Sequence, residues 1–357
     1  MRQFNILGAG LSGLSAAINL AEAGFKVNVF DVRKDSGARF EGDLQGLENW
    51  TNEISILEDL KEMNIKVNFH CNPFKKVFLT DGRKTSEINF SRPMFYLVKR
   101  GTMVDSIDQG LKRQAIDKGV QISYNTKFES KADIIATGPK PSGRLFGIDR
   151  GIVFDTEIED TAVAIVNTEA TYKAYSYLLV TEGYGCIATV LYDKFHLVNK
   201  CLERTKEIAI KLFDVKIKNE KGVGGIGNFI YPQKLQENDS LFVGEAGGLQ
   251  EALWGFGMRY AMTSGYLAAN SITQGLQYKK LVDEKFDNQF KASIVNRFMW
   301  EIMIGKAINW LKFNYKTYSK KDTLKFFNKL YNFTLTYQKL LYPIAYLWFK
   351  SKYKGVM

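Results

Sequence analysis

A glycine-rich turn at residues 8–13 constrains this chain more than any other feature of its sequence. It separates the apolar residues 4–7, which predict a short strand, from the Ala- and Leu-rich residues 14–23, which predict a helix. Residues 26–30 predict a second strand. Such a unit of about thirty residues has the size of one βαβ half, so the chain is predicted to begin with a Rossmann-type α/β fold.

The spacing Gly8-x-Gly10-x-x-Gly13 gives each glycine a physical task. Gly8 permits the tight turn, Gly10 lets the backbone approach a pyrophosphate, and Gly13 lets the helix pack on the sheet. Leu11 and Ser12 lie in the same turn, where free N–H groups at a helix N-terminus favour an anion. The pattern predicts dinucleotide binding.

An acid follows the second strand at the position that the dinucleotide fold requires. Asp31 closes that strand and precedes Val32, and both are predicted to bind the cofactor. The Asp31 carboxylate can accept hydrogen bonds from ribose hydroxyls and would repel a 2′-phosphate. The residue therefore favours FAD or NAD over NADP.

A second glycine pattern follows a predicted strand at residues 241–243. It comprises residues 244–248 (GEAGG) and residues 254–262 (WGFGMRYAM), and residues 258–274 predict a helix rich in small side chains. The pattern resembles the para-hydroxybenzoate-hydroxylase-like flavoproteins, and within them the geranylgeranyl reductase branch. The resemblance covers about residues 3–270 and implies that the cofactor is FAD.

The resemblance also assigns residues to the cofactor. It implies that Gly244 and Glu245 approach the ribityl and pyrophosphate portion, and that Gly255, Gly257 and Met258 face the isoalloxazine ring. Glu245 stands where the family usually has aspartate.

Four more residues take their predicted roles from the same resemblance. It implies that Arg100, at the end of the predicted strand 95–99, lies near the phosphate–ribityl side. It places Arg39 near the adenosine side, and Thr137 and Gly138 where the chain returns to FAD. The alternative for either arginine is a surface salt bridge.

The middle of the chain alternates short apolar segments with turns and predicts an antiparallel sheet outside the Rossmann unit. Its tyrosines, Tyr175, Tyr177, Tyr184 and Tyr192, are expected to cover the isoalloxazine ring. Further predicted strands are residues 66–69, 77–79, 120–124, 132–136, 163–166, 175–180, 186–192 and 196–198.

The overall fold class is therefore α/β, or α+β for the whole chain, with an inserted sheet. Residues 1–150 and 222–275 are predicted to form a discontinuous FAD-binding domain. Residues 151–221, with part of 66–100 as an alternative addition, are predicted to form the substrate domain, and residues 276–357 a basic, aromatic helical region.

The three cysteines, Cys71, Cys186 and Cys201, form no CxxC pair and predict a reducing, cytoplasmic setting. No Cys/His spacing predicts a metal site. Cys186 either lines the substrate pocket or is a small buried residue, and His196 is expected to be structural. The sequence predicts no signal peptide and no transmembrane helix.

The basic charge is concentrated in the tail. Residues 306–357 contain eleven lysines, no arginine and one acid, Asp322, interleaved with aromatic residues. The tail either docks on an anionic membrane surface at the inner face of the membrane or packs on the flavin domain. Lysine without arginine argues against nucleic acid as a partner.

Flavin supplies redox chemistry, which explains the lack of an acid–base motif and leaves the catalytic residues unknown. The family resemblance, together with the basic aromatic tail, implies an FAD-dependent oxidoreductase that reduces carbon–carbon double bonds of an isoprenoid or related lipid at the membrane surface. The sequence does not assign the electron donor, for which NAD(P)H and a ferredoxin-like protein are the two candidates. Alternatives are a hydroxylase or quinone-linked dehydrogenase of the same fold, or a membrane-associated FAD-binding protein without turnover.

Overall fold

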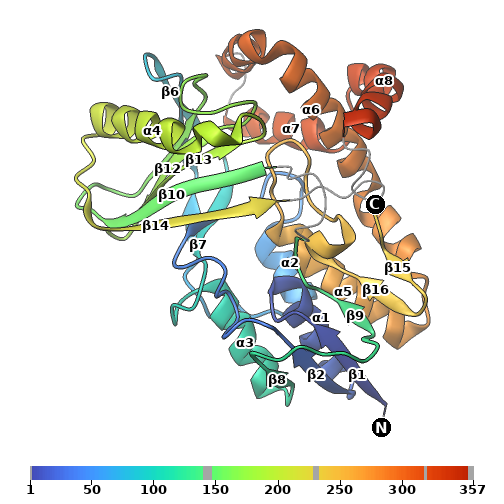
Figure 1. Cartoon of the computed structure of the whole chain (residues 1–357). Coiled ribbons are helices and arrows are strands. Elements are labelled where there is room, and N and C mark those ends of the chain that lie inside the picture. The colour runs from blue at the N-terminus through green and yellow to red at the C-terminus, as the bar shows by residue number, and fades with distance from the viewer. Residues whose placement is uncertain (1, 140–146, 228–232, 317–319, 353–357) are drawn as a thin grey trace.

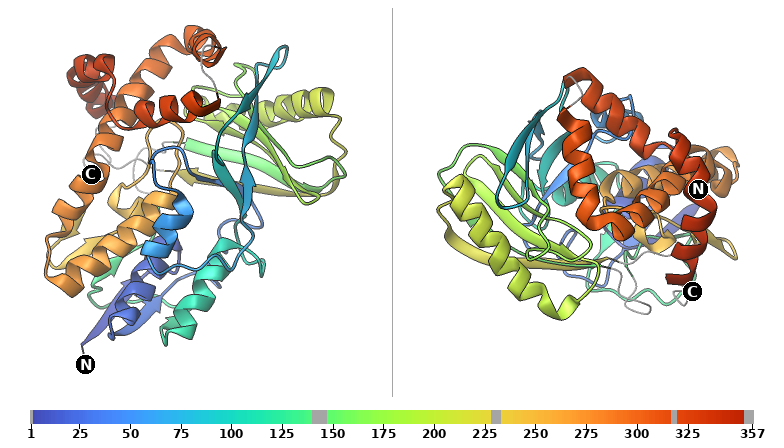
Figure 2. Two further views of the ribbon diagram at one scale, coloured as in Figure 1. Left: turned by 180° about the vertical axis from the view of Figure 1, so that it is seen from behind. Right: turned by 90° about the horizontal axis from the view of Figure 1, so that it is seen from above.

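The computed structural model describes residues 2–139, 147–227, 233–316 and 320–352, and of residues 303–322 it describes no side chains. Three sheets and a set of helices form two lobes with a helical cap (Figure 1). The dinucleotide-binding lobe carries the N-terminus, and the cap lies at the opposite end of the molecule, as the rear view also shows (Figure 2).

A six-stranded sheet forms the dinucleotide-binding lobe in the order β15-β16-β9-β1-β2-β8. All neighbours pair in parallel except β15 with β16. The predicted Rossmann-type unit is therefore confirmed. The strands are β1 (Gln3–Leu7), β2 (Lys26–Phe30), β8 (Gln121–Ser123), β9 (Ile134–Ile135), β15 (Gln236–Glu237) and β16 (Ser240–Phe242).

Helices cover this sheet because their apolar faces need burial. Leu14 and Ile18 of α1, Leu111 of α3 and Met262 of α5 are fully buried in one core with Ile6. The helices that contribute to this core are α1 (Leu11–Glu22), α2 (Ile56–Glu62), α3 (Ile107–Asp117), α5 (Met258–Gln274) and the first turns of α6 (Tyr278–Lys316).

A seven-stranded, mostly antiparallel sheet forms the second lobe in the order β14-β10-β13-β12-β11-β5-β6. One face packs on α4 (Val198–Phe213). The predicted antiparallel sheet is present, and residues 76–89 extend it. Its strands are β5 (Lys76–Thr80), β6 (Thr85–Asn89), β10 (Gly147–Asp155), β11 (Thr161–Ile165), β12 (Ser176–Thr181), β13 (Tyr184–Leu191) and β14 (Lys218–Gly227).

A small sheet lies between the lobes and consists of β3 (Leu44–Glu48), β7 (Phe95–Lys99) and β4 (Asn72–Phe74), in that order. Both β3 and β4 pair antiparallel with β7. The chain therefore crosses between the lobes several times, and the predicted domain boundaries stay a prediction.

Three helices, α6, α7 (Lys320–Tyr331) and α8 (Thr336–Lys352), form the C-terminal cap. Leu330 and Tyr331 of α7 are buried against the inner face of the seven-stranded sheet, and Phe349 of α8 is buried against α6 residues such as Val295. Much of the described tail thus packs on the protein. Among the described residues, no helix combines the length and the apolar character that a membrane crossing needs.

Two predicted strands are wrong. Residues 66–69 form a loop, whose Lys66 N–H and C=O are both hydrogen-bonded by the Gln114 side chain instead of by a neighbouring strand. His196 lies in a 3-10 helix, Phe195–Leu197, that leads directly into α4. In both segments short apolar runs suggested a strand, but tertiary packing decided otherwise.

Candidate functional site

A cavity of about 980 Å³ runs from the glycine-rich turn to the C-terminal cap. It brings together nearly all the predicted cofactor residues, although these come from distant parts of the chain. Its lining includes Gly8, Gly10, Leu11, Ser12, Asp31, Val32, Arg39, Arg100, Thr137, Gly138, Glu245, Gly255, Gly257 and Met258. Gly13 and Gly244 do not line it.

The turn at residues 8–13 shapes the first end of the cavity. Gly8 has a φ of +104°, and a Cβ there would lie 2.3 Å from the Ala136 carbonyl oxygen, so only glycine fits. A Cβ on Gly13 would lie 2.0 Å from the Gly8 carbonyl oxygen, which confirms close helix–strand packing. A Cβ on Gly10 would meet no atom within 4 Å. The space beside Gly10 therefore fits a pyrophosphate.

The charges at this end suit a dinucleotide. Helix α1 begins after Gly10 without a side-chain cap, so its first N–H groups remain available to a phosphate. The Asp31 carboxylate accepts hydrogen bonds from the N–H groups of Ala9 (2.7 Å) and Arg33 (2.8 Å). These bonds orient Asp31 at the cavity wall, where its remaining lone pairs can accept hydrogen bonds from ribose hydroxyls.

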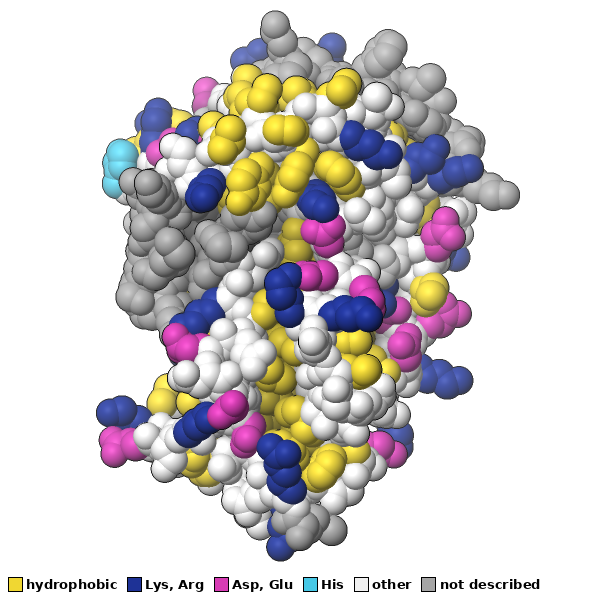
Figure 3. Space-filling model, turned by 90° about the vertical axis from the view of Figure 1, so that its right-hand side faces the viewer, with side chains coloured by type: hydrophobic (Ala, Val, Ile, Leu, Met, Phe, Trp, Pro, Cys, Tyr) yellow, Lys and Arg dark blue, Asp and Glu magenta, His cyan; other side chains and the backbone are white. Residues whose placement is uncertain are grey.

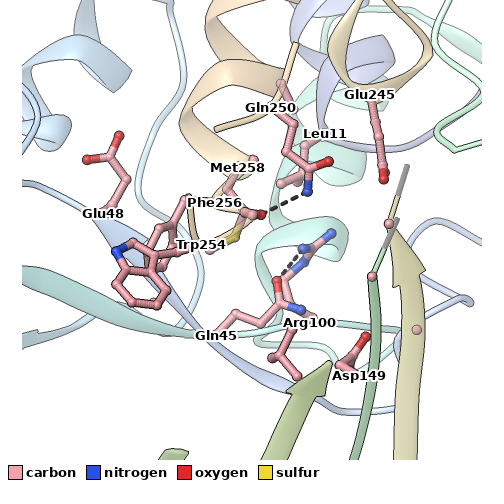
Figure 4. A pocket seen from close by; sticks show the side chains of 18 of the residues that line it. Leu11, Gln45, Glu48, Arg100, Asp149, Glu245, Gln250, Trp254, Phe256 and Met258 are labelled. Carbon is pink, nitrogen blue, oxygen red and sulfur yellow. Dashed lines mark hydrogen bonds between the residues drawn. The ribbon is translucent and has the colours of Figure 1, made fainter. Parts of the chain in front are cut away.

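Arg39 and Glu245 join the two parts of the chain that build the middle of the cavity. An Arg39 Nη lies 3.3 Å from a Glu245 Oε, and the other Nη donates to the Ile226 carbonyl oxygen at 3.2 Å. Both side chains line the cavity, and Glu245 is shown pointing toward it in Figure 4. Arg39 thus forms a salt bridge, as the alternative interpretation expected, but this salt bridge lies at the wall of the candidate site.

Arg100 is held rigidly inside the protein. Its guanidinium donates to both carboxylate oxygens of Asp108, at 2.8 and 3.0 Å, and lies 3.7 Å from the centre of the Phe40 ring. Another Nη donates to the Gln45 side chain at 2.9 Å, a bond drawn in Figure 4. Arg100 is only 5% exposed, so the alternative of a surface salt bridge is excluded.

The loop before α5 forms the next part of the wall. Gly255 has a φ of +82°, and α5 begins after Gly257 without a side-chain cap. Buried Glu251 holds the loop by accepting the N–H groups of Leu253 (2.7 Å) and Trp254 (2.6 Å). Burial raises the pKa of Glu251 to about 7. Gly257 and Met258 line the cavity, so the positive N-terminal end of α5 lies at its wall, where it would favour negative charge on a reduced flavin.

Gln250 provides a polar group that the protein itself leaves open. Its Nε2 donates to the Gly255 carbonyl oxygen at 2.8 Å (Figure 4), while its buried Oε1 has no partner among the described residues. A buried unpaired acceptor is costly unless a ligand supplies a donor. The isoalloxazine ring carries an N–H donor, so this residue fits FAD. No pattern in the sequence pointed to Gln250.

Beyond this loop the cavity becomes apolar. It extends between the inner face of the seven-stranded sheet and α7, a helix that the sequence did not connect with the site. Phe90 of the loop after β6 and Phe327 of α7 meet with ring centres 5.9 Å apart. The apolar lining includes Val77, Leu79, Ile88, Phe90, Ala164, Leu179, Phe326, Phe327 and Leu330.

One group of buried charges borders the cavity near Trp50. Arg259 lies between two carboxylates, pairing with Asp59 and lying 3.8 Å from Glu48. Glu48 lines the cavity, and burial raises its pKa despite Arg259 and the Thr51 hydroxyl, which donates to it. Because the single cation, Arg259, lies closer to Asp59 than to Glu48, the ionised form of Glu48 is the less stabilised of the two carboxylates.

Only some of the residues of the middle sheet that were predicted to form the pocket line the cavity. Tyr175, Tyr177 and Tyr192 line the cavity, whereas the Tyr184 hydroxyl donates to the Gly42 carbonyl oxygen at 2.7 Å. Cys186 is buried behind the wall, in agreement with the second of its two readings. Within the described residues, no group of three His, Cys, Asp or Glu side chains is placed to hold a metal ion.

Asp43, behind the cavity wall, is expected to make stability depend on pH. Burial, and secondarily Asp149, raise its pKa to about 7. The folded state then holds the proton more tightly than the unfolded state, whose aspartate titrates near pH 4, so stability falls as pH rises through this interval. Asp43→Asn removes this pH dependence. Between pH 4 and 7, urea unfolding should therefore show the free energy of unfolding of the variant rising relative to that of the wild type by about 1.4 kcal/mol per pH unit.

A carboxylate with the opposite shift provides the control. The hydrogen bond from Lys173 lowers the pKa of Asp193, so its stabilisation is present above the unfolded pKa and lost in acid. Asp193→Asn should therefore lose stability relative to the wild type as pH rises toward 4. Parallel curves for the wild type and Asp43→Asn between pH 4 and 7 would contradict the assignment of Asp43.

The fold and the geometry of the cavity are those of a Rossmann-type dinucleotide-binding domain. Residues 6–43 match the family model of the NAD(P)-binding Rossmann-like domain. The comparison with curated proteins found no match.

Several solved structures share the fold over nearly the whole chain. One is a geranylgeranyl bacteriochlorophyll reductase-like protein from Thermoplasma acidophilum, with 14% identity, a TM-score of 0.65, and coverage of 98% of this chain and 100% of that chain. A flavin-dependent brominase has 14% identity, a TM-score of 0.66 and the same coverage. A flavoprotein/dehydrogenase from Cytophaga hutchinsonii has 15% identity, a TM-score of 0.63 and again the same coverage. The chain thus has the predicted flavoenzyme fold.

Proposed function

We propose that this protein is an FAD-dependent oxidoreductase that reduces carbon–carbon double bonds of an isoprenoid or related lipid taken from a membrane surface. The observation that carries the proposal is the continuity of the cavity. It leads from a polar end that fits a dinucleotide to an apolar end, and a pocket of that kind selects an apolar ligand.

The residues present fit FAD along the cavity. Gly10 and the N-terminus of α1 would hold the pyrophosphate, Asp31 the ribose, and Gln250 with the N-terminus of α5 the ring. Bound there in its reduced form, FAD would supply the hydride chemistry that reduction of a double bond needs, with the second hydrogen taken from solvent as a proton. The role of the protein is then to place the double bond and exclude water.

The apolar wall would place the substrate beside the ring. Trp254 and Phe256 lie next to Met258 in Figure 4, and all three line the cavity. Trp254 packs edge-on against Trp300, with ring centres 4.7 Å apart. A solubilised polyprenyl chain would replace water along these side chains, and its burial provides the driving force.

The test is anaerobic reoxidation of the reduced holoprotein by a polyprenyl lipid. We expect the flavin absorption to return only when the lipid is added, with a product that has gained two hydrogens by mass spectrometry. In a parallel aerobic assay, oxygen uptake with formation of a hydroxylated product would instead favour the hydroxylase. Flavin that stays reduced with every lipid tried, in folded protein, would contradict the proposal.

A variant that narrows the apolar end links the reaction to the cavity. Ala164 lies on β11 opposite Tyr177 and lines the cavity, so Ala164→Trp would fill the apolar space without touching the dinucleotide end. We expect the variant to retain its flavin spectrum and its reoxidation by dioxygen, but to lose reoxidation by the lipid at least tenfold. Equal loss of both reactions would point to misfolding.

A further inference from the structure

One face of α8 exposes a row of large apolar side chains. Leu340, Ile344 and Leu347 are 73%, 59% and 66% exposed, and Pro343 between them is also exposed. Their spacing places them on a single side of the helix. Solvent-exposed aliphatic residues are common singly, but a contiguous row marks an interaction surface.

The opposite face of α8 is firmly packed, so the exposed row does not result from a detached helix. Ala345 and Phe349 are fully buried against α6. Trp348 packs edge-on against Phe298 with ring centres 5.4 Å apart. The helix therefore presents its outer face in a fixed orientation.

Positive charge flanks the exposed row. Lys339 and Lys350 are exposed at its two ends, and α8 contains Lys352 as a third lysine but no acidic residue. Lys352 pairs with Glu301 of α6. Figure 3 shows apolar side chains gathered at the cap end of this side of the molecule, with lysine and arginine side chains around them.

From these observations we infer that the outer face of α8, Leu340, Pro343, Ile344 and Leu347 with Lys339 and Lys350, docks on an anionic lipid bilayer. Aliphatic side chains would enter the boundary between headgroups and acyl chains, while the lysines contact the anionic headgroups. A second copy of this chain is a poorer occupant, because two such faces would bring lysines together without any acid of α8 to pair them.

The same cap borders the apolar end of the cavity. Tyr337, in the first turn of α8, lines the cavity, and its hydroxyl donates to the Asn296 side chain at 3.2 Å. The exposed apolar row of α8 begins three residues later, at Leu340. Figure 1 shows α7 and α8 together at the end of the molecule away from β1. Docking would thus bring the apolar end of the cavity to the bilayer; this route for a lipid substrate rests on the proposed function, whereas the docking itself does not.

The test is sedimentation of the flavin-bound full chain with vesicles of phosphatidylglycerol and phosphatidylcholine. We expect binding that weakens with salt and is much poorer on pure phosphatidylcholine. Leu340→Ser, Ile344→Ser and Leu347→Ser together should weaken binding at least about tenfold. Lys339→Gln and Lys350→Gln should each weaken it about fivefold and reduce the salt dependence.

Two exposed apolar residues elsewhere provide the matched control. Val104 and Ile116 are 77% and 49% exposed on the dinucleotide-binding lobe, so Val104→Ser with Ile116→Ser should leave vesicle binding unchanged. Flavin absorption and the thermal midpoint verify folding, and Leu347→Asp alone serves if the triple variant does not fold.

Three results would overturn the inference. They are equal sedimentation of the wild type and the α8 variants, no sedimentation of the wild type, and a dimer in solution that the triple variant abolishes. The first would place any membrane contact elsewhere, and the last would assign the face to a second copy. Vesicle binding needs no turnover, so the outcome of the vesicle assay does not depend on whether the protein reduces a lipid.

Discussion

Gly10→Val is expected to yield a folded protein that has lost its flavin. Gly10 has a φ of −85°, which any residue adopts, and a Cβ there would meet no protein atom within 4 Å. The valine side chain would therefore fill the space for the pyrophosphate without straining the turn. We expect FAD affinity to fall at least about a hundredfold, because the clash also separates the phosphate from the N–H groups of α1. Flavin absorption after reconstitution measures the loss.

Another glycine with a free Cβ position provides the control. Gly222 on β14 likewise has no atom within 4 Å of a Cβ, so Gly222→Val tests for a general effect of adding a side chain and should retain FAD. Gly13→Ala, by contrast, should impair folding, because its Cβ would lie 2.0 Å from the Gly8 carbonyl oxygen. Normal flavin content in Gly10→Val would show that the pyrophosphate does not lie beside this turn.

Asp108→Ala is expected to cost about 3–5 kcal/mol of folding free energy. The substitution leaves the Arg100 guanidinium buried without its carboxylate and removes the acceptor of the Gly101 N–H, at 3.0 Å. An uncompensated buried cation is among the most destabilising single changes. Because Arg100 lines the cavity, we also expect weaker FAD binding. Urea unfolding with and without added FAD separates the two effects.

A nearby ion pair whose carboxylate is exposed gives the comparison. Lys99 lies 2.7 Å from Asp105, but the Asp105 side chain is 41% exposed, so Asp105→Ala should cost at most about 1 kcal/mol. If Asp108→Ala and Asp105→Ala cost the same, burial of the Arg100 pair is not what stabilises this part of the wall.

The dinucleotide end of the site was predictable residue by residue. The turn at 8–13, its flanking strands and Asp31 lie within about thirty residues, so local sequence determines their geometry. The resemblance extended the prediction to Arg39, Arg100 and the loop at 255–258, all of which the structure brings to one cavity. Their contacts with FAD stay a prediction.

Strand β14 shows where local pattern fails. Its sequence KNEKGVGGIG has too many glycines to suggest a strand. Pairing with β10 creates it, and the pairing explains the glycines, because a Cβ on Gly224 would lie 2.7 Å from the Asp149 carbonyl oxygen. Gly224 and Gly225 both line the cavity, where side chains would narrow it.

The sequence by itself therefore determined the Rossmann-type unit and its glycine-rich turn, since these rest on short-range spacing and on special backbone geometry, whereas the roles of the predicted cofactor residues stay a prediction. Only the tertiary structure decided the apolar end of the cavity, where Phe326, Phe327 and Leu330 of α7 meet strands β5 and β6, far away in the chain. The physical reason is that apolar burial is non-directional: an aromatic helix is compatible with many surfaces, and the shape of the whole fold selects the one it covers.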